Sequence, residues 1–203
     1  MLIAFYITYN DMPLIEKSLE SVSGKFDNVY AVDGRFEDFP GRDDYSTDGT
    51  LEYLRRHEVS VIKLAGVSEP IKRDVVFDVA GPGDTVLVID ADEVLVGDVS
   101  PISTDCCRIM ISESVSGARL NYTNCSRLIK VCQGLHYSSH HAIVDSSGQL
   151  FADSAGCGEG YTISEANTFY LEHLRGSRGY DRDFLKKIYY KTLEQNEKVM
   201  QAG

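Results

Sequence analysis

The chain has 203 residues, of which 43% are hydrophobic, and its formal net charge is -11 with a sequence pI near 4.8. This length and composition suit one compact domain with a core of its own. The negative charge argues against a nucleic-acid partner and against binding to an anionic membrane, because both would repel the chain.

Strand-like and helix-like patterns alternate through the first half. Buried strands are predicted by the apolar runs 2–7, 28–32, 59–64 and 86–89, and amphipathic segments at 14–22, 51–56 and 68–80 predict helices between them. In the third helix we expect an inward face that contains Ile71, Val75, Val76 and Val79, with Lys72 and Arg73 in its first turn. The connections are short, so we predict right-handed crossovers and a mainly parallel sheet flanked by helices.

Three of these strands end in polar residues: Thr8-Tyr9-Asn10, Asp33 and Asp90-Ala91-Asp92. The carboxyl ends of parallel strands share one edge, where open α/β sheets bind their ligands. Carboxylates this close repel one another unless a positive group lies between them, and a divalent cation is the usual solution. We therefore predict a metal site there, although the acids could instead simply cap a loop or the next helix.

The second half has a different pattern. Short alternating segments at 106–111, 127–131, 140–144 and 149–151 predict antiparallel strands over the edge of the sheet, and 169–173 predicts a last strand. A helical pattern from about residue 181 predicts a C-terminal helix.

The chain contains five cysteines and no C-x-x-C spacing: Cys106, Cys107, Cys125, Cys132 and Cys157. An odd number without such spacing fits neither a disulfide framework nor a zinc cluster. We expect reduced cysteines and a cytoplasmic protein. The apolar run 2–7 is too short for a membrane span, so we expect no span there.

The motifs follow one another in a fixed order: Thr8-Tyr9-Asn10, Val32-Asp33-Gly34, Ser46 to Thr50, and Val88 to Glu93. In this order the chain resembles the family-two glycosyltransferases of the GT-A fold, well over the first half and loosely over the second. The resemblance implies a single Rossmann-like α/β domain, with a nucleotide-binding half at 1–99 and an acceptor-binding half at 100–203. It also implies inverting transfer of a sugar from a nucleoside-diphosphate sugar to a glycan, protein or small-molecule acceptor.

The resemblance further implies roles for single residues. Asp33 would accept a hydrogen bond from the base, and Arg73 would position the nucleotide. Asp90 would face the ribose and would also be a ligand of the metal, together with Asp92. Thr8, Tyr9 and Asn10 would line the pocket for the base and ribose. His173 would be the third protein ligand of the metal, and Arg175 and Arg178 would bind the diphosphate. The metal would be Mn²⁺ or Mg²⁺, and it would neutralise the charge of the leaving diphosphate.

The general base is left open by the sequence. The segment from Arg127 to His141 resembles a pattern of some family members that ends in a His-Glu pair, but here the pair is His140-His141. Either histidine suits a base, because the ordinary pKa of imidazole is about 6.5. Glu93 and Asp145 are rivals, and each histidine could equally be an ordinary strand residue.

Two other functions compete with sugar transfer. The run Asp90 to Leu95 also matches the nucleophile motif of haloacid-dehalogenase-like phosphatases, which need that motif on the first strand. A catalytically inactive glycan- or nucleotide-binding module is the other alternative, because the Glu after the histidine is missing. The polar insert 35–45 lies at the predicted ligand edge, and we predict that it is a lid or selectivity loop.

Overall fold

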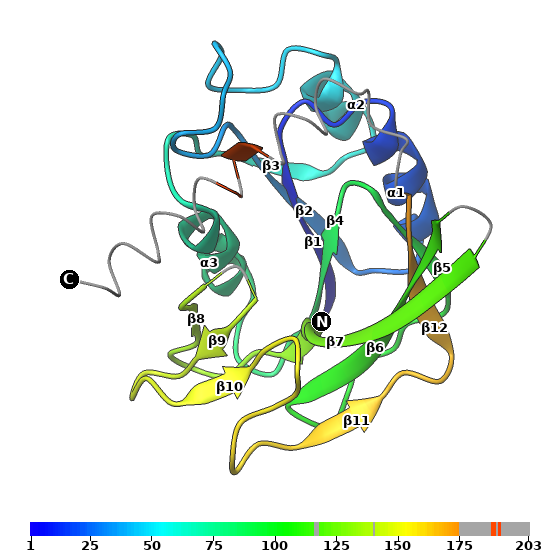
Figure 1. The fold of residues 1–203 in the computed structure, drawn as a ribbon, viewed down its shortest axis with the longest axis vertical. Coiled ribbons are helices and arrows are strands. Elements are labelled where there is room, and N and C mark those ends of the chain that lie inside the picture. The colour runs from blue at the N-terminus through cyan, green and yellow to red at the C-terminus, as the bar shows by residue number, and fades with distance from the viewer. Residues whose placement is uncertain (116–117, 140, 175–187, 190, 192–203) are drawn as a thin grey trace.

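The computed structural model describes residues 1–115, 118–139, 141–174, 188, 189 and 191 (Figure 1). The first half contains, in chain order, β1 (Leu2–Thr8), α1 (Leu14–Val22), β2 (Asn28–Asp33), α2 (Thr50–Arg56), β3 (Ser60–Lys63), α3 (Glu69–Val79), β4 (Thr85–Asp90) and β5 (Glu93–Gly97). The second half contains β6 (Cys106–Val115), β7 (Ala118–Lys130), β8 (His136–Tyr137), β9 (Ile143–Val144), β10 (Leu150–Ala152), β11 (Ile163–Glu165) and β12 (Phe169–His173).

Within the described residues, these strands form a nine-stranded sheet and a three-stranded accessory sheet, β10-β9-β8. The main sheet has the order β3-β2-β1-β4-β7-β6-β12-β5, with β11 paired to β6. Its first four strands are parallel. The predicted α/β class and Rossmann-like arrangement are therefore confirmed.

The strand order contains a switch point between β1 and β4. From β1 the chain builds β2 and then β3 on one side, and it returns to place β4 on the other side of β1. The registers pair Thr8 with Asp33 and Ile7 with Asp90, so the three strands end level with one another. In open α/β sheets, ligands bind outside the carboxyl ends of the strands at such a point.

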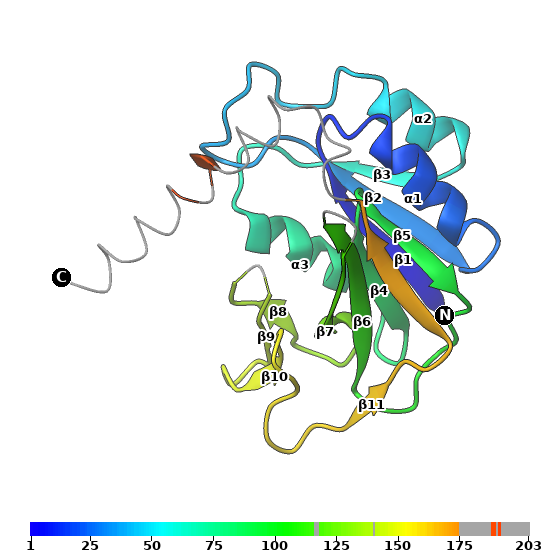
Figure 2. The ribbon, with the colours of Figure 1, turned by 45° about the vertical axis from the view of Figure 1, so that its right-hand side comes forward.

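The two faces of the main sheet are covered differently (Figure 2). On one face lie α1 and α2, and α1 buries Leu14, Ile15, Leu19 and Val22. On the other face lie α3 and the accessory sheet. Alternate residues of the central strands serve the two faces, as the period of two in a strand requires.

The orientation of α3 differs from the sequence prediction. Ile71 is 52% exposed, whereas the buried residues of this helix are Glu69, Lys72, Arg73 and Val76. The inward placement of Val76 is confirmed and that of Ile71 was wrong, while Val75 and Val79 are partly buried. The reason is tertiary: the inward side of the first turns of α3 meets polar groups at the ligand edge, so charged side chains find partners there.

The second half extends the main sheet instead of only covering its edge. β7 is antiparallel to both β4 and β6, as the pattern predicted, and β12 runs parallel to β6. β5, which was not predicted, pairs with β12. Most of the predicted C-terminal helix lies outside the described residues. Among the residues described, no helix combines the length and the hydropathy needed to cross a membrane.

The cysteines depart from expectation at one pair. Cys106, at the start of β6, forms a disulfide with Cys157, which lies 51 residues later in the loop after β10. The prediction that all five cysteines are reduced was therefore wrong. Sequence spacing could not show the pair, because the fold brings the loop after β10 beside β6. Cytoplasmic localisation rested on reduced cysteines and stays a prediction.

Candidate functional site

The site is built at the carboxyl edge of the main sheet. Asp33 ends β2 and Asp90 ends β4, and the two flank the end of β1. His173 ends β12, which runs in the same direction as β6, and it pairs in register with Glu93 at the start of β5. Residues distant in sequence therefore meet along one edge.

Asp33 is fully buried beside the loop that follows β1. Its Oδ2 accepts a hydrogen bond from the backbone N–H of Ser46 at 3.1 Å, and its Oδ1 accepts one from the Ser46 hydroxyl. The Ser46 hydroxyl also accepts the N–H of Asn10 at 2.7 Å, which joins the loops after β1 and before α2. Burial raises the pKa of Asp33, while the hydrogen bonds from Ser46 and the charge of Lys72 oppose that rise.

Tyr9 and the insert 35–45 form a second part of this corner. The Tyr9 hydroxyl donates to the carbonyl of Asp43 at 2.8 Å, and the Tyr9 ring lies edge-on to Phe39 at 6.0 Å. Phe39 in turn contacts Tyr189, with 5.3 Å between ring centroids. The predicted surface loop is confirmed as a loop, and its aromatic residues tie it to Tyr9; its role as a lid stays a prediction.

Asp90 is bound by two arginines. The Nη2 of Arg127 donates to Asp90 Oδ2 at 2.8 Å and to Glu93 Oε1 at 3.0 Å. Arg73 donates through Nε and Nη2 to Glu69 Oε1, at 3.0 and 2.8 Å, and its Nη2 lies 3.4 Å from Asp90 Oδ1. The positive charge that the clustered acids require is thus supplied beside Asp90 by guanidinium groups.

Glu93 is enclosed by its own hydrogen bonds. Its Oε2 accepts the N–H of Asp90 at 2.8 Å, while its Oε1 faces Arg127. Burial raises the pKa of Glu93 to about 7, and the charge of Arg127 opposes that rise. Such a pKa suits a general base, but both oxygens hold the start of β5 and Arg127 in place.

Asp92 and His173 form the part of the site that best fits a cation. His173 Nε2 lies 3.0 Å from Asp92 Oδ2, and His173 Nδ1 lies 3.0 Å from Glu113 Oε1. Burial disfavours the charged form of His173, but Asp92, Glu93 and Glu113 outweigh this and raise its pKa. A carboxylate on the far nitrogen is the arrangement that orients metal-binding histidines.

No group of three or more His, Cys, Asp or Glu side chains converges as a metal site among the residues that the structure describes. Asp92 and His173 supply two donors with a fixed orientation, whereas the Asp90 carboxylate is bound to Arg73 and Arg127. A cation held by Asp90, Asp92 and His173 therefore stays a prediction, because both ring nitrogens of His173 lie against carboxylates in this structure.

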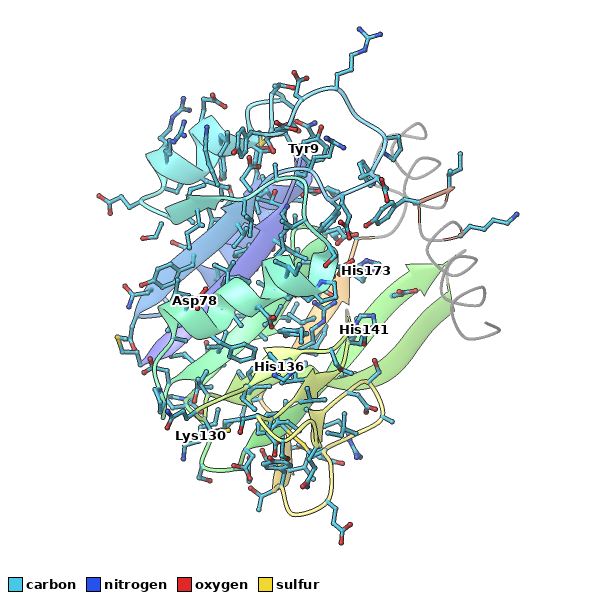
Figure 3. The ribbon with its side chains drawn as sticks, turned by 90° about the vertical axis from the view of Figure 1, so that its left-hand side faces the viewer. Tyr9, Asp78, Lys130, His136, His141 and His173 are labelled. Atoms are coloured by element: carbon cyan, nitrogen blue, oxygen red, sulfur yellow. A yellow bond between two sulfur atoms is a disulfide. The ribbon has the colours of Figure 1, made fainter. Side chains whose placement is uncertain are left out.

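The candidate bases on the acceptor side are only partly described. His141 lies beside the accessory sheet, and Figure 3 shows it on the same side of the molecule as His173. His140, Arg175 and Arg178 lie outside the described residues. Asp145 accepts hydrogen bonds from Ser147, and these together with one from Tyr161 lower its pKa, which makes it a weak base that shapes a turn.

Two acidic residues of the site were missed by the sequence analysis: Glu69 and Glu113. Glu113 shares its strand face with Ile109 and Ile111, so a charge in the apolar alternation was the signal that could have revealed it. Glu69 is buried against Arg73, four residues later in α3, and a charged pair at this spacing is normally read as solvent-exposed.

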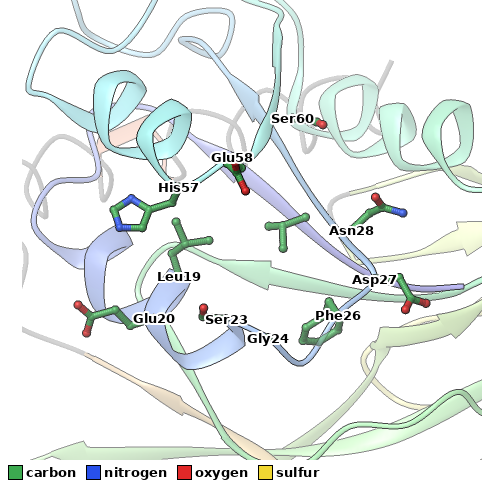
Figure 4. Close-up of a pocket in the computed structure, with 11 residues that line it drawn as sticks. Leu19, Glu20, Ser23, Gly24, Phe26, Asp27, Asn28, His57, Glu58 and Ser60 are labelled. Atoms are coloured by element: carbon green, nitrogen blue, oxygen red, sulfur yellow. The ribbon is translucent and has the colours of Figure 1, made fainter.

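A separate groove lies at the opposite edge of the sheet (Figure 4). It has a volume of about 350 Å³ and lies between the ends of α1 and α2 and the starts of β2 and β3. Its lining includes Glu20, Phe26, Asp27, His57 and Glu58. The groove is therefore distinct from the edge where Asp33, Asp90 and His173 meet.

Comparison with known proteins adds little to the description of the fold and the site. No family model matches the chain, and no curated protein matches it. A crystal structure of S. aureus TarS 1-349 is similar with a TM-score of 0.42 and 21% identity, over 58% of this chain and 37% of that one. A second structure, of S. aureus TarS, is similar with a TM-score of 0.39 and 22% identity, over 58% and 22%. The aligned part is thus only 37% and 22% of the two TarS chains, and likenesses this low have no bearing on function.

The structure does not meet the requirement of the phosphatase alternative that its motif lie on the first strand. Asp90 ends β4, the fourth strand of the chain, whereas that motif needs the first strand. Its carboxylate is also bound by Arg127 and Arg73, which leaves it poorly suited to act as a nucleophile.

Proposed function

We propose that the chain is a metal-dependent glycosyltransferase that moves a sugar from a nucleoside-diphosphate sugar to an acceptor hydroxyl. One observation carries the proposal: Asp33 at the end of β2 and Asp90 at the end of β4 lie level on either side of the end of β1, at the switch point where open α/β sheets bind ligands. His173 joins them from the second half of the chain. The sequence motifs Val32-Asp33-Gly34 and Asp90-Ala91-Asp92 lie at these positions.

In this proposal the nucleoside lies over the ends of β1 and β2, with Thr8, Tyr9 and Asn10 around it and Asp33 accepting from the base. Asp90 faces the ribose, Arg73 positions the nucleotide, and Arg175 and Arg178 bind the diphosphate. Asp92 and His173 would hold Mn²⁺ or Mg²⁺, which when bound stabilises the charge on the leaving diphosphate. Mg²⁺ is normally bound through one or two carboxylates plus phosphate oxygens, so a site with few protein donors is suitable.

We assign the acceptor proton to the histidine pair. Glu93 is buried and both of its oxygens are engaged, so it holds Arg127 and the backbone of Asp90 instead of reaching a substrate hydroxyl. His141 lies beside the accessory sheet, from which an acceptor could approach the edge. Glycan, protein and small-molecule acceptors are all compatible with this arrangement.

The experiment that tests the function is a thermal-shift screen of UDP, GDP and ADP with and without Mn²⁺, followed by turnover of the matching labelled sugar nucleotide. A ligand that binds only the folded state raises its melting temperature by mass action. We expect one nucleotide to raise it in a Mn²⁺-dependent way, and Asp92→Asn to abolish that dependence. Asp78→Asn, on the exposed side of α3, is the matched control (Figure 3). No shift with any nucleotide and no turnover would refute the function, whereas a shift without turnover would favour the inactive binding module.

Metal binding can be tested without nucleotide. Glu113 orients His173, and loss of such a partner typically weakens metal binding by about 10- to 100-fold. We expect Glu113→Gln to weaken Mn²⁺ binding to the protein alone in calorimetry, with the exposed Glu172→Gln as control. Equal affinities in the two variants would remove His173 from the metal site.

A further inference from the structure

Lys72 occupies an unusual position for a lysine. It lies in α3, its side chain is fully buried, and its amine contacts the carbonyl oxygen of Gly34, the residue directly after Asp33. The amine also lies 4.6 Å from the centroid of the Phe36 ring. The sequence analysis placed Lys72 in the first turn of a helix and gave it no role.

The groups around Lys72 come from four segments. Asp33 ends β2, Asp11 follows β1, Glu69 belongs to α3, and Phe36 belongs to the insert. All three carboxylates favour the charged form of the lysine. The ammonium group therefore lies where the segments of the predicted nucleotide corner meet.

The Gly34 corner that Lys72 contacts is itself closely packed. Gly34 has a φ of +147°, and a Cβ at this position would collide with the carbonyl oxygen of Leu64. The N–H of Gly34 donates to the carbonyl of Thr8 at 3.1 Å. Since the backbone is confined on both sides, a contact to the Gly34 carbonyl fixes the position of the adjacent Asp33.

A purely structural role explains this lysine poorly. Burial lowers the pKa of Lys72 to about 8, even though Asp33, Asp11 and Glu69 oppose that change. The charged form is thus less favourable in the folded chain than in water, and an apolar side chain of similar length would cost less. Buried charges kept against stability tend to serve function.

We propose that Lys72 is a positioning residue of the nucleotide site: its ammonium group keeps the Asp33 carboxylate ionised and fixes the Gly34 corner that presents this carboxylate to the nucleobase. The inference rests on the proposed function, in which Asp33 accepts a hydrogen bond from the base. Without Lys72, the buried carboxyl would take up a proton more readily, because only the hydrogen bonds from Ser46 would then oppose the effect of burial. A protonated Asp33 would no longer be the charged acceptor that binds a base N–H strongly.

The decisive experiment follows the carboxyl carbon of Asp33 by ¹³C NMR through a pH titration, with the signal assigned from Asp33→Asn. We expect Lys72→Met to raise the pKa of Asp33, because the charge of Lys72 favours the ionised carboxylate. Lys72→Arg keeps the charge and should restore most of the original value. Lys63→Met is the matched control, because Lys63 pairs in register with Asp33 but is exposed and lies over the ring of Tyr45. An unchanged Asp33 titration in Lys72→Met would overturn the proposal.

A binding experiment tests the same coupling by a double-mutant cycle. We expect Lys72→Met to weaken UDP or GDP binding about tenfold in calorimetry, and to have no further effect in the Asp33→Asn background, because the two residues act as a unit. Additive losses would mean that Lys72 acts other than through Asp33 and would also overturn the proposal. Circular dichroism checks that the variants are folded, and Lys72→Gln replaces Lys72→Met should the latter not fold.

The two proposals fail in different ways. If the unaltered protein binds neither nucleotide, the proposed function fails, while the Asp33 titration still decides whether Lys72 controls that carboxyl. If nucleotide binds and the titration does not move, the glycosyltransferase proposal stands and the role of Lys72 falls.

Discussion

The helices α1 and α3 cover opposite faces of the same sheet, yet they bury opposite kinds of side chain. α1 buries Leu14, Ile15, Leu19 and Val22, which are apolar, and one small polar residue, Ser18. α3 buries three charged residues, Glu69, Lys72 and Arg73, and only one apolar residue, Val76. It leaves Ile71 exposed. Both helices begin at the carboxyl edge of the sheet, so distance from that edge does not explain the difference.

What differs is the role of each helix. The buried face of α1 stabilises the fold mainly through burial of apolar area, and its Ser18 hydroxyl donates to the hydroxyl of Tyr6 at 3.1 Å. The inward face of α3 meets Asp33 and Gly34 at one point and Asp90 at another. A helix that carries charges into a ligand edge gives up hydrophobic stabilisation, and it arranges the charges that a ligand would contact.

The largest effect on stability is expected at Arg73. In Arg73→Ala the buried Glu69 loses its ion pair with Arg73, and Asp90 loses one of its two arginines. Removing one member of a buried ion pair typically costs roughly 3–5 kcal/mol, because the remaining charge is left uncompensated. Urea denaturation would measure the loss, with the exposed Arg55→Ala of α2 as control. A loss similar to that of the control would show that the α3 charges are effectively solvated, and the contrast with α1 would disappear.

On the α1 side the expected effect is slightly smaller and of a different kind. Ile15 is fully buried, and Ile15→Ala should destabilise the fold by roughly 3 kcal/mol through lost burial and the cavity left behind. Nucleotide affinity, measured under conditions where the variant is folded, should not change. A weakened affinity would mean that α1 contributes to the site and would remove the distinction between the two helices.

The buried amine of Lys72 makes the free energy of unfolding depend on pH. Below pH 8 the lysine is charged in both the folded and the unfolded chain, and its burial costs stability. Between about 8 and the ordinary value of 10.5 the folded chain binds fewer protons than the unfolded chain, so stability contributed by this group rises with pH. The lowering of the Lys72 pKa from 10.5 to about 8 corresponds to at most about 3 kcal/mol in the free energy of unfolding.

The measurement is the free energy of unfolding of the unaltered protein and of Lys72→Met at several pH values from 7 to 10.5. The unaltered protein should gain on the variant as pH rises, because only it carries the buried amine. A difference that stays constant with pH would show that Lys72 keeps its ordinary pKa in the folded chain.

Local patterns predicted the elements of the first half well, since apolar runs and helical spacing are properties of neighbouring residues. The orientation of α3 was not predictable in this way. Ile71 and Val75 have the spacing of a buried face. The contacts that turn the helix come from distant residues: Lys72 contacts Gly34, 38 residues away, and Arg73 contacts Asp90, 17 residues away. The Cys106–Cys157 pair is hidden for the same reason.

The candidate site was predictable in part. Asp33, Asp90, Asp92 and His173 stand at strand ends, and strand ends can be read from the sequence, so their common edge follows from topology. Arg127 was noted as part of a motif, but its role between Asp90 and Glu93 depends on β7 lying beside β4. The sequence therefore led us to predict a metal ion as the positive charge beside the acidic residues. It could not show that Arg127, from the distant strand β7, supplies a positive charge there.

The smallest effect is expected in the groove at the opposite edge. Glu20 lines this groove at the end of α1 and is exposed, so Glu20→Gln should change the free energy of unfolding by less than about 0.5 kcal/mol, the usual range for surface substitutions. Nucleotide affinity should be unchanged, because the groove lies at the amino-terminal ends of β2 and β3, away from the switch point. Calorimetry with the same nucleotides and the Asp33→Asn variant measured in parallel would test this. If Glu20→Gln weakened binding as much as Asp33→Asn, the ligand would lie at the wrong edge for the charges of α3 to matter, and the contrast between the two helices would have to be explained by folding alone.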